Sequence, residues 1–115
     1  METYKQRIIQ ELVPGKQITL AHIIANPDSS LFANLGIESS ANSAISVMTI
    51  TPPETAIIIA DIAIKSAGVR LISVDRTSGS LITAGKVSEV EAAASAILDY
   101  VREKLGFEVC GLTKT

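Results

Sequence analysis

The chain has 115 residues, enough for one compact domain with its own core, and its net charge of −2 without a basic cluster argues against nucleic acid as a partner. No apolar run approaches the roughly 20 residues that cross a bilayer, so no membrane contact is expected, and the single cysteine, Cys110, cannot form a disulfide within the chain. Hydrophobic residues make up 47% of the chain but aromatic residues only 3%. Because a small domain cannot bury so much aliphatic surface alone, this composition predicts a homo-oligomer.

The first 43 residues are predicted to add two strands and a helix to the main pattern of the chain. One strand is expected at residues 8–13, where a Pro-Gly pair follows it, and a second, buried strand at residues 18–25. Asn26 and the proline after it are predicted to be the N-cap and the first residue of a short helix over residues 26–35. A polar linker at residues 38–43 completes this part.

Two longer helices are predicted in the remainder of the chain, at residues 51–67 and 88–105. Each starts at a capping-box pattern, in which a hydroxyl residue, Thr51 or Ser88, is followed three residues later by a glutamate. Each should end before a glycine, which is Gly68 for the first helix. Local signals therefore mark both ends of both helices.

The two helices differ in how much apolar surface they have. In the second helix the apolar residues form one stripe opposite Asp99 and Arg102, as in a helix that lies on a sheet. In the first helix the strongly polar residues fall on one narrow stripe, where Asp61 and Lys65 form an i,i+4 pair. One sheet face cannot cover the remaining circumference, so a neighbouring subunit is expected to bury part of it. Isoleucines occupy that circumference: Ile57, Ile58, Ile59, Ile62 and Ile64.

Four short β-branched strands frame these helices, and the order from residue 44 onward is β-α-β-β-α-β. The fold class expected is therefore α+β, a ferredoxin-like βαββαβ unit with the helices on one face of the sheet. A small hairpin loop joins the middle two strands, with Gly79 at a position of positive φ. The strands are expected at residues 44–50, 69–75, 81–87 and 107–112.

Several segments of the chain resemble one protein family. The longest is the run IIQELVPGKQITLAHIIANP at residues 8–27, followed by MTITP at 48–52, ADIAIK at 60–65, VDR at 74–76 and LTKT at 112–115. They occur in one order over nearly the whole chain. Together they resemble the circularly permuted bacterial microcompartment (BMC) shell proteins of the ethanolamine- and propanediol-utilisation type.

The resemblance implies a structural role in a protein shell in the cytoplasm. Members of the family form cyclic hexamers that tile edge to edge, so the implied partners are other copies of this chain, other shell proteins and the enclosed aldehyde-producing enzymes. It also implies one permuted BMC domain over residues 1–115, with a barrel strand in 1–15, a permuted strand and helix in 16–43 and the βαββαβ core in 44–115. Six N-terminal strands would form a small axial β-barrel from Arg7, Ile8, Ile9, Gln10, Glu11, Leu12 and Val13.

The resemblance further implies two kinds of position in the hexamer. Lys65 matches the lysine at the hexamer edge, although a surface lysine paired with Asp61 near a helix end explains its position as well. Two edge positions depart from ordinary shell proteins: Gly68 stands where they usually have Asn, and Asn26 where they often have an arginine between prolines. The hairpin loop matches their pore-lining loop, with a plain turn as the alternative. The loop residues are Thr77, Ser78, Gly79 and Ser80.

An enzyme is not expected from these residues. His22 and Cys110 could formally make a nucleophilic pair, but both fall in predicted apolar strands, where a hydrogen-bonded histidine and a small buried cysteine are simpler explanations. One His and one Cys cannot form a structural zinc site within the chain, and no cofactor is expected.

The rival hypothesis is a ligand-sensing regulatory module, because ferredoxin-like domains often bind small molecules at subunit interfaces. Such a sensor would be a small discrete oligomer, whereas a shell protein would be a hexamer. For a shell protein, the pathway depends on the enclosed enzymes, and ethanolamine, propanediol, choline and other glycyl-radical pathways are the candidates.

Overall fold

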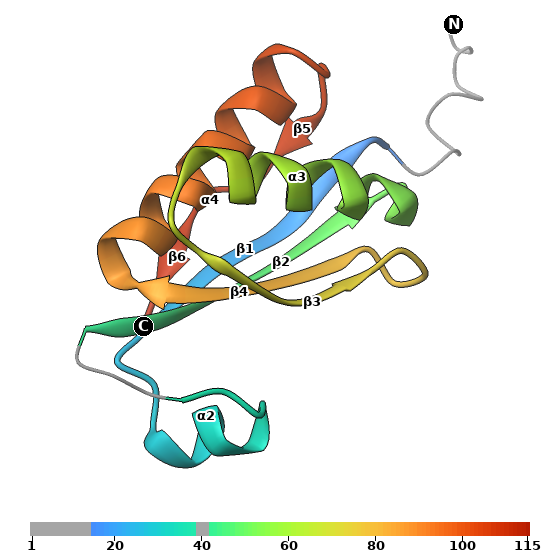
Figure 1. Cartoon of the computed structure of the whole chain (residues 1–115). Coiled ribbons are helices and arrows are strands. Elements are labelled where there is room, and N and C mark those ends of the chain that lie inside the picture. The colour runs from blue at the N-terminus through green and yellow to red at the C-terminus, as the bar shows by residue number, and fades with distance from the viewer. Residues whose placement is uncertain (1–14, 39–41) are drawn as a thin grey trace, which may run out of the picture.

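The computed structural model describes residues 15–38 and 42–115, which form one mixed sheet with helices packed on it (Figure 1). The α+β class predicted from the sequence is confirmed at the level of a single sheet with helices. The strands are β1 (Gln17–Ala25), β2 (Ser43–Thr51), β3 (Arg70–Asp75), β4 (Ser80–Lys86), β5 (Glu108–Val109) and β6 (Thr113–Lys114). The helices are α2 (Ser29–Asn34), the 3-10 helix η1 (Pro53–Thr55), α3 (Ala56–Ser66) and α4 (Val87–Glu103).

The strands lie in the order β3-β4-β2-β1-β5, and β6 also pairs with β1. β1 runs antiparallel to β2, from Gln17 opposite Thr51 to Ala25 opposite Ala44. β5 and β6 are short and run parallel to β1. The single strand predicted at residues 107–112 is therefore wrong for most of its length. β1 takes the place beside β2 that the closing strand of a βαββαβ unit would take.

The main core lies between the sheet and the two long helices, α3 and α4 (Figure 1). Alternate residues of a strand face opposite sides of the sheet, and Ala44, Met48 and Ile50 of β2 face these helices. The apolar stripe predicted for the second helix is confirmed in α4, which lies against the sheet along one side. The buried residues of α4 are Val90, Ala93, Ala94, Ile97, Leu98 and Val101.

A second, smaller cluster lies on the opposite face of the sheet. Phe32 of α2 packs there with Ile45 of β2 and Ala84 of β4, and all three side chains are buried. The expectation that the two long helices share one face is confirmed for α3 and α4, whereas the short helix α2, which precedes that unit, covers the opposite face. The physical reason is that β2 is apolar on both sides, since Ile45 and Val47 alternate with the residues of the main core. Each face of the sheet then needs its own cover.

Both predicted capping boxes are wrong. Thr51 is the last residue of β2, where it pairs with Gln17, and α3 begins only at Ala56, after η1. α4 begins at Val87, one residue before Ser88, and no side chain caps the start of either helix. Because the strand ladder holds Thr51 extended, its hydroxyl does not lie at a helix start, and the sequence matches the composition of a capping box without its geometry.

The short helix α2 is capped by Asp28 and not, as predicted, by Asn26. The Asp28 carboxylate accepts hydrogen bonds from the amide and the hydroxyl of Ser30, at 2.9 and 2.8 Å. These bonds, chiefly the one from the amide, hold the pKa of Asp28 below its usual value. Asn26 instead has a φ of 50°, a conformation that asparagine tolerates better than most residues. Asn26 is therefore a turn residue between β1 and the helix.

Candidate functional site

Isoleucines line the outer surface of α3. Ile57, Ile58 and Ile64 are 53%, 44% and 51% exposed, whereas Ile59 of the same helix is fully buried. The wide apolar circumference predicted for this helix is confirmed. Large apolar side chains that gather on one exposed surface mark an interaction site. One side of α3 therefore belongs to the core, and another side is available to a partner.

Lys65 lies in the last turn of α3, where its ammonium forms an ion pair with Asp61 at 2.8 Å. This confirms the i,i+4 pair predicted from the sequence. The hydrogen bond to Asp61 is the main reason that the pKa of Lys65 is raised. The two side chains are 76% and 57% exposed, so the pair adds little to stability. Its effect is to hold the lysine beside the C-terminal end of the helix, where a positive charge is favourable.

The other two predicted edge residues lie on separate elements. Gly68 follows α3 by two residues, and its amide donates to the Glu89 carboxylate at 2.7 Å. The predicted end of this helix before Gly68 is confirmed, since Ala67 is the C-cap and has an extended backbone. Gly68 does not have the positive φ of a typical glycine at this position. Asn26 follows β1, and its amide donates to the carbonyl oxygen of Ser43 at 3.0 Å. The edge role of all three residues stays a prediction.

The predicted pore loop is the turn between β3 and β4, and Asp75 organises it. Oδ1 of Asp75 accepts hydrogen bonds from the amides of Thr77, at 2.8 Å, and Ser78, at 3.3 Å. The carbonyl oxygen of Asp75 accepts from the amide of Gly79, and the carbonyl of Gly79 accepts from the amide of Ile50 at the end of β2. The predicted positive φ of Gly79 is confirmed at 80°. The turn is thus tied both to its own strand and to a neighbouring one.

Asp75→Ala should loosen this turn without unfolding the domain. The amides of Thr77 and Ser78 hold the pKa of Asp75 below its usual value. A lowered pKa in the folded state means that this stabilisation is complete above the ordinary pKa of Asp and is lost as the pH falls through the folded value. We expect weaker protection of both amides from hydrogen exchange, relative to an unprotected amide at the same pH, in the variant at neutral pH and in the unchanged protein only at acidic pH. Equal protection in the two proteins at neutral pH would show that the carboxylate does not hold the turn.

His22 and Cys110 lie on opposite faces of the sheet and do not form a nucleophilic pair. Both neighbours of His22 in β1 belong to the main core, so its imidazole faces the other side. There Nδ1 lies 2.5 Å from the hydroxyl of Thr113, and Nε2 lies 2.9 Å from that of Thr115. Cys110 packs against the main core. The predicted hydrogen-bonded structural histidine is confirmed.

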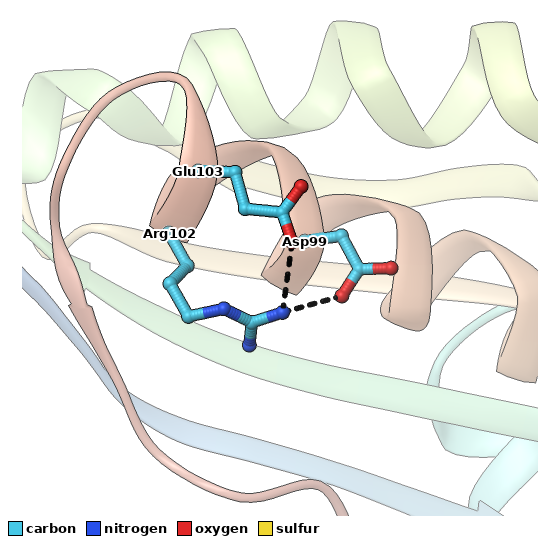
Figure 2. Close-up of polar contacts among 3 residues, drawn as sticks. All are labelled: Asp99, Arg102 and Glu103. Carbon is cyan, nitrogen blue, oxygen red and sulfur yellow. Dashed lines mark hydrogen bonds and ion pairs between the residues drawn. The ribbon is translucent and has the colours of Figure 1, made fainter.

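The solvent side of α4 has a three-residue group of charges near its C-terminal end (Figure 2). Nη2 of Arg102 lies 2.9 Å from Oδ1 of Asp99 and 3.5 Å from Oε2 of Glu103. All three side chains are at least half exposed, so each pair stabilises the fold only slightly. The polar stripe predicted opposite the apolar side of this helix is confirmed, and within this group Arg102 offsets one of the two carboxylate charges.

The predicted axial barrel, residues 7–13, lies outside the described residues. Within residues 15–38 and 42–115, no group of three or more His, Cys, Asp and Glu side chains could hold a metal ion. No helix in the same ranges has both the length and the apolar character needed to cross a membrane.

Comparison with known proteins relates nearly the whole chain to one family. A family model described as "BMC domain" matches residues 44–110. The bacterial microcompartment shell protein CutR of Streptococcus intermedius is 49% identical over 109 residues, which are 95% of this chain and 92% of the relative. The bacterial microcompartment shell protein PduU of Salmonella typhimurium is 47% identical over 109 residues, 95% of this chain and 93% of the relative. A solved flat hexamer of CutR has a TM-score of 0.84 and 48% identity, covering 95% of this chain and 99% of that chain.

Proposed function

Since the chain belongs to the BMC-domain family of bacterial microcompartment shell proteins, we propose that the exposed isoleucines of α3 join its subunits in the hexamer. The chain is a structural shell protein and not an enzyme, and it assembles as a hexamer with other shell proteins as partners. The relatives lend no support to a regulatory module. The single observation behind the interface is the exposure of Ile57, Ile58 and Ile64 on a helix whose other side is buried. Such an apolar surface is stabilised when a neighbouring subunit covers it.

The first experiment on this proposal is the native mass of the purified protein by light scattering. A mass near six times the 12.1 kDa of one chain is expected. A stable dimer or trimer would contradict the hexamer and would favour the regulatory module again. The same measurement is the reference for every variant described below.

We also propose that the domain is circularly permuted. β1 and α2 precede residues 44–110, which the family model matches, yet β1 lies inside the sheet beside β2. A change of chain start within an unchanged fold would produce this arrangement, because the strand that closes the sheet would then come first in the chain. On this proposal the whole chain is one domain, in which residues 16–43 are the permuted part that supplies the closing strand and residues 44–115 form the remainder.

The N-terminal part, residues 1–15, is proposed to supply one strand to a small barrel over the six-fold axis. The support is the run at residues 8–27, which resembles the N-terminus of the permuted shell proteins. A variant that lacks residues 1–13 should keep both its hexamer mass and its helix content, because the described strands and helices begin at Gln17. Loss of either property, measured by light scattering and circular dichroism, would contradict this division of the chain.

Lys65 is proposed to lie at the outer edge of the hexamer, with Asn26 and Gly68 at other edge positions. The lysine is 76% exposed, stands at one end of α3 and is held along the helix by Asp61. An ammonium fixed in this way can donate to the backbone or to a carboxylate of a neighbouring hexamer. This packing would be polar, in contrast to the apolar surface proposed between subunits.

Lys65→Ala is expected to impair the formation of sheets of hexamers while the hexamer itself persists. The lost contact recurs along every edge, so sheets should need about tenfold more protein to form, as judged by electron microscopy. Lys104→Ala is the matched control, because Lys104 is an exposed cation just beyond α4. Dissociation of the hexamer in Lys65→Ala would instead mean that Lys65 lies between subunits.

The turn after β3 is proposed to line the axis of the hexamer. After the exposed Arg76, the residues of this turn are small, and the hydroxyls of Ser78 and Ser80 lie 3.0 Å apart. Backbone amides and hydroxyls of this kind can contact polar metabolites. The residues of this proposed pore lining are Thr77, Ser78, Gly79 and Ser80.

A further inference from the structure

A cavity of about 350 Å³ lies on the α2 side of the sheet, where β4 ends. Its apolar wall includes Phe32 and Ala84, both of which are buried. The volume lies in the range of small-molecule sites. The cavity includes neither the isoleucines of α3 nor the turn at Gly79, and Gly68 is the residue that it shares with the proposed edge positions.

Two positively charged side chains line this cavity from neighbouring strands. Arg70 of β3 pairs with Ala84 of β4, so the two residues share a face of the sheet. Lys86 follows Ala84 by two residues and therefore belongs to the same face. The strand register thus brings Arg70 and Lys86 to the wall where Phe32 lies.

Neither charge forms a salt bridge with another residue that the structure describes, although Glu38 lines the same cavity. The salt bridges of that part of the chain involve Lys65, Arg102 and Lys114, and neither Arg70 nor Lys86 takes part in one. Lys86 is also the N-cap residue of α4, where the helix dipole makes a positive charge unfavourable. An anion bound beside it would offset both effects.

We propose that this cavity binds a small oxyanion, either phosphate or a carboxylate with a short alkyl chain. The guanidinium of Arg70 offers a planar pair of donors for two oxygens, and the ammonium of Lys86 adds a point charge. Phe32 and Ala84 would contact the alkyl part of a carboxylate. Glu38 also lines the cavity and opposes an anion, but the two cations outnumber it. The site is separate from the proposed hexamer interface.

Calorimetric titration of the purified hexamer at low ionic strength, with inorganic phosphate and with propionate, tests this site. We expect saturable binding that Arg70→Gln or Lys86→Gln weakens about tenfold, because each removes a charged hydrogen-bond donor. Glu38→Gln should strengthen binding, since it removes the opposing charge. A tighter complex with phosphate would identify charge as the main determinant, and a tighter complex with propionate would identify the apolar wall at Phe32.

Lys104→Gln is the matched control. Lys104 is exposed and lies at the far end of α4, roughly 25 Å from Lys86 by the length of the helix, and its loss should change affinity less than about twofold. Equal weakening by Lys104→Gln would overturn the proposal, because it would indicate diffuse attraction between charges. Absence of saturable binding to an intact hexamer would overturn it as well. The hexamer mass of the same samples is measured separately, so failure of this site leaves the shell role unaffected.

Discussion

Gly79→Ala is expected to lower the free energy of unfolding by about 3 kcal/mol, from backbone strain and overpacking together. Gly79 has a φ of 80°, which an L side chain rarely adopts. A Cβ atom at this position would lie 2.1 Å from the carbonyl oxygen of Ile50 and 3.0 Å from Cα of Pro53. Both contacts are with backbone, so the new methyl group cannot be accommodated by turning a side chain. The turn would have to leave the end of β2.

Urea denaturation at one fixed protein concentration measures this effect, since the stability of an oligomer depends on concentration. The matched control is Gly36→Ala. Gly36 has nearly the same φ, 75°, but an added Cβ would meet nothing within 4 Å. Gly36→Ala should therefore lower the free energy of unfolding by about 1 kcal/mol, from backbone strain alone. Equal losses in the two variants would show that close approach to Ile50 does not matter at Gly79.

Replacement of both Ile57 and Ile64 by Ser is expected to dissociate the hexamer into smaller species with intact secondary structure. Burial of one isoleucine is worth about 2 kcal/mol, and the two changes recur at every interface of a cyclic assembly. Both side chains are about half exposed in the subunit, so the fold itself should lose little. Light scattering and circular dichroism on the same sample report the two properties separately.

Ile59→Ala, on the same helix, should have the opposite effect: it should lower the stability of the fold and leave the hexamer assembled. Ile59 is fully buried, and its truncation should cost about 3 kcal/mol of unfolding free energy through the cavity it leaves. Below its own unfolding transition, this variant should still be a hexamer. A double Ser variant at positions 57 and 64 that remains hexameric would show that the exposed surface of α3 is not the interface.

Features set by residues close together in the chain were predictable from the sequence. The apolar stripe of α4, the pair of Asp61 and Lys65, and the positive φ of Gly79 depend only on helix or turn geometry, and each is present. The exposure of isoleucines on α3 was predictable for a related reason. A helix that is apolar around most of its circumference cannot bury all of its apolar side chains against one sheet. Of the candidate sites, the turn at Gly79 and the lysine at the end of α3 follow from such signals.

One local signal was present but was assigned to the wrong residue. Asp28 stands two residues before Ser30, and aspartate is as good an N-cap as asparagine. The Asn26-Pro27 pair resembles a helix start more closely, yet Asn26 is needed in the turn that leaves β1. The turn after β1 occupies Asn26, so Asp28 is the N-cap of α2 although both residue types are good caps.

The starts of the long helices, the order of the sheet and the cavity were decided only by tertiary structure. Thr51 has the residue type of a cap, but pairing with β1 keeps it in a strand, and no local pattern encodes that pairing. β1 lies beside β2 because their apolar sides meet in one sheet, although the sequence pattern equally allows residues 107–112 in that place. Arg70 and Lys86 are distant in the chain, and the register of β3 on β4 brings them to one wall. Sequence by itself therefore determined which segments are apolar, and on which sides, whereas the choice among segments that could cover one another required the long-range contacts of the fold.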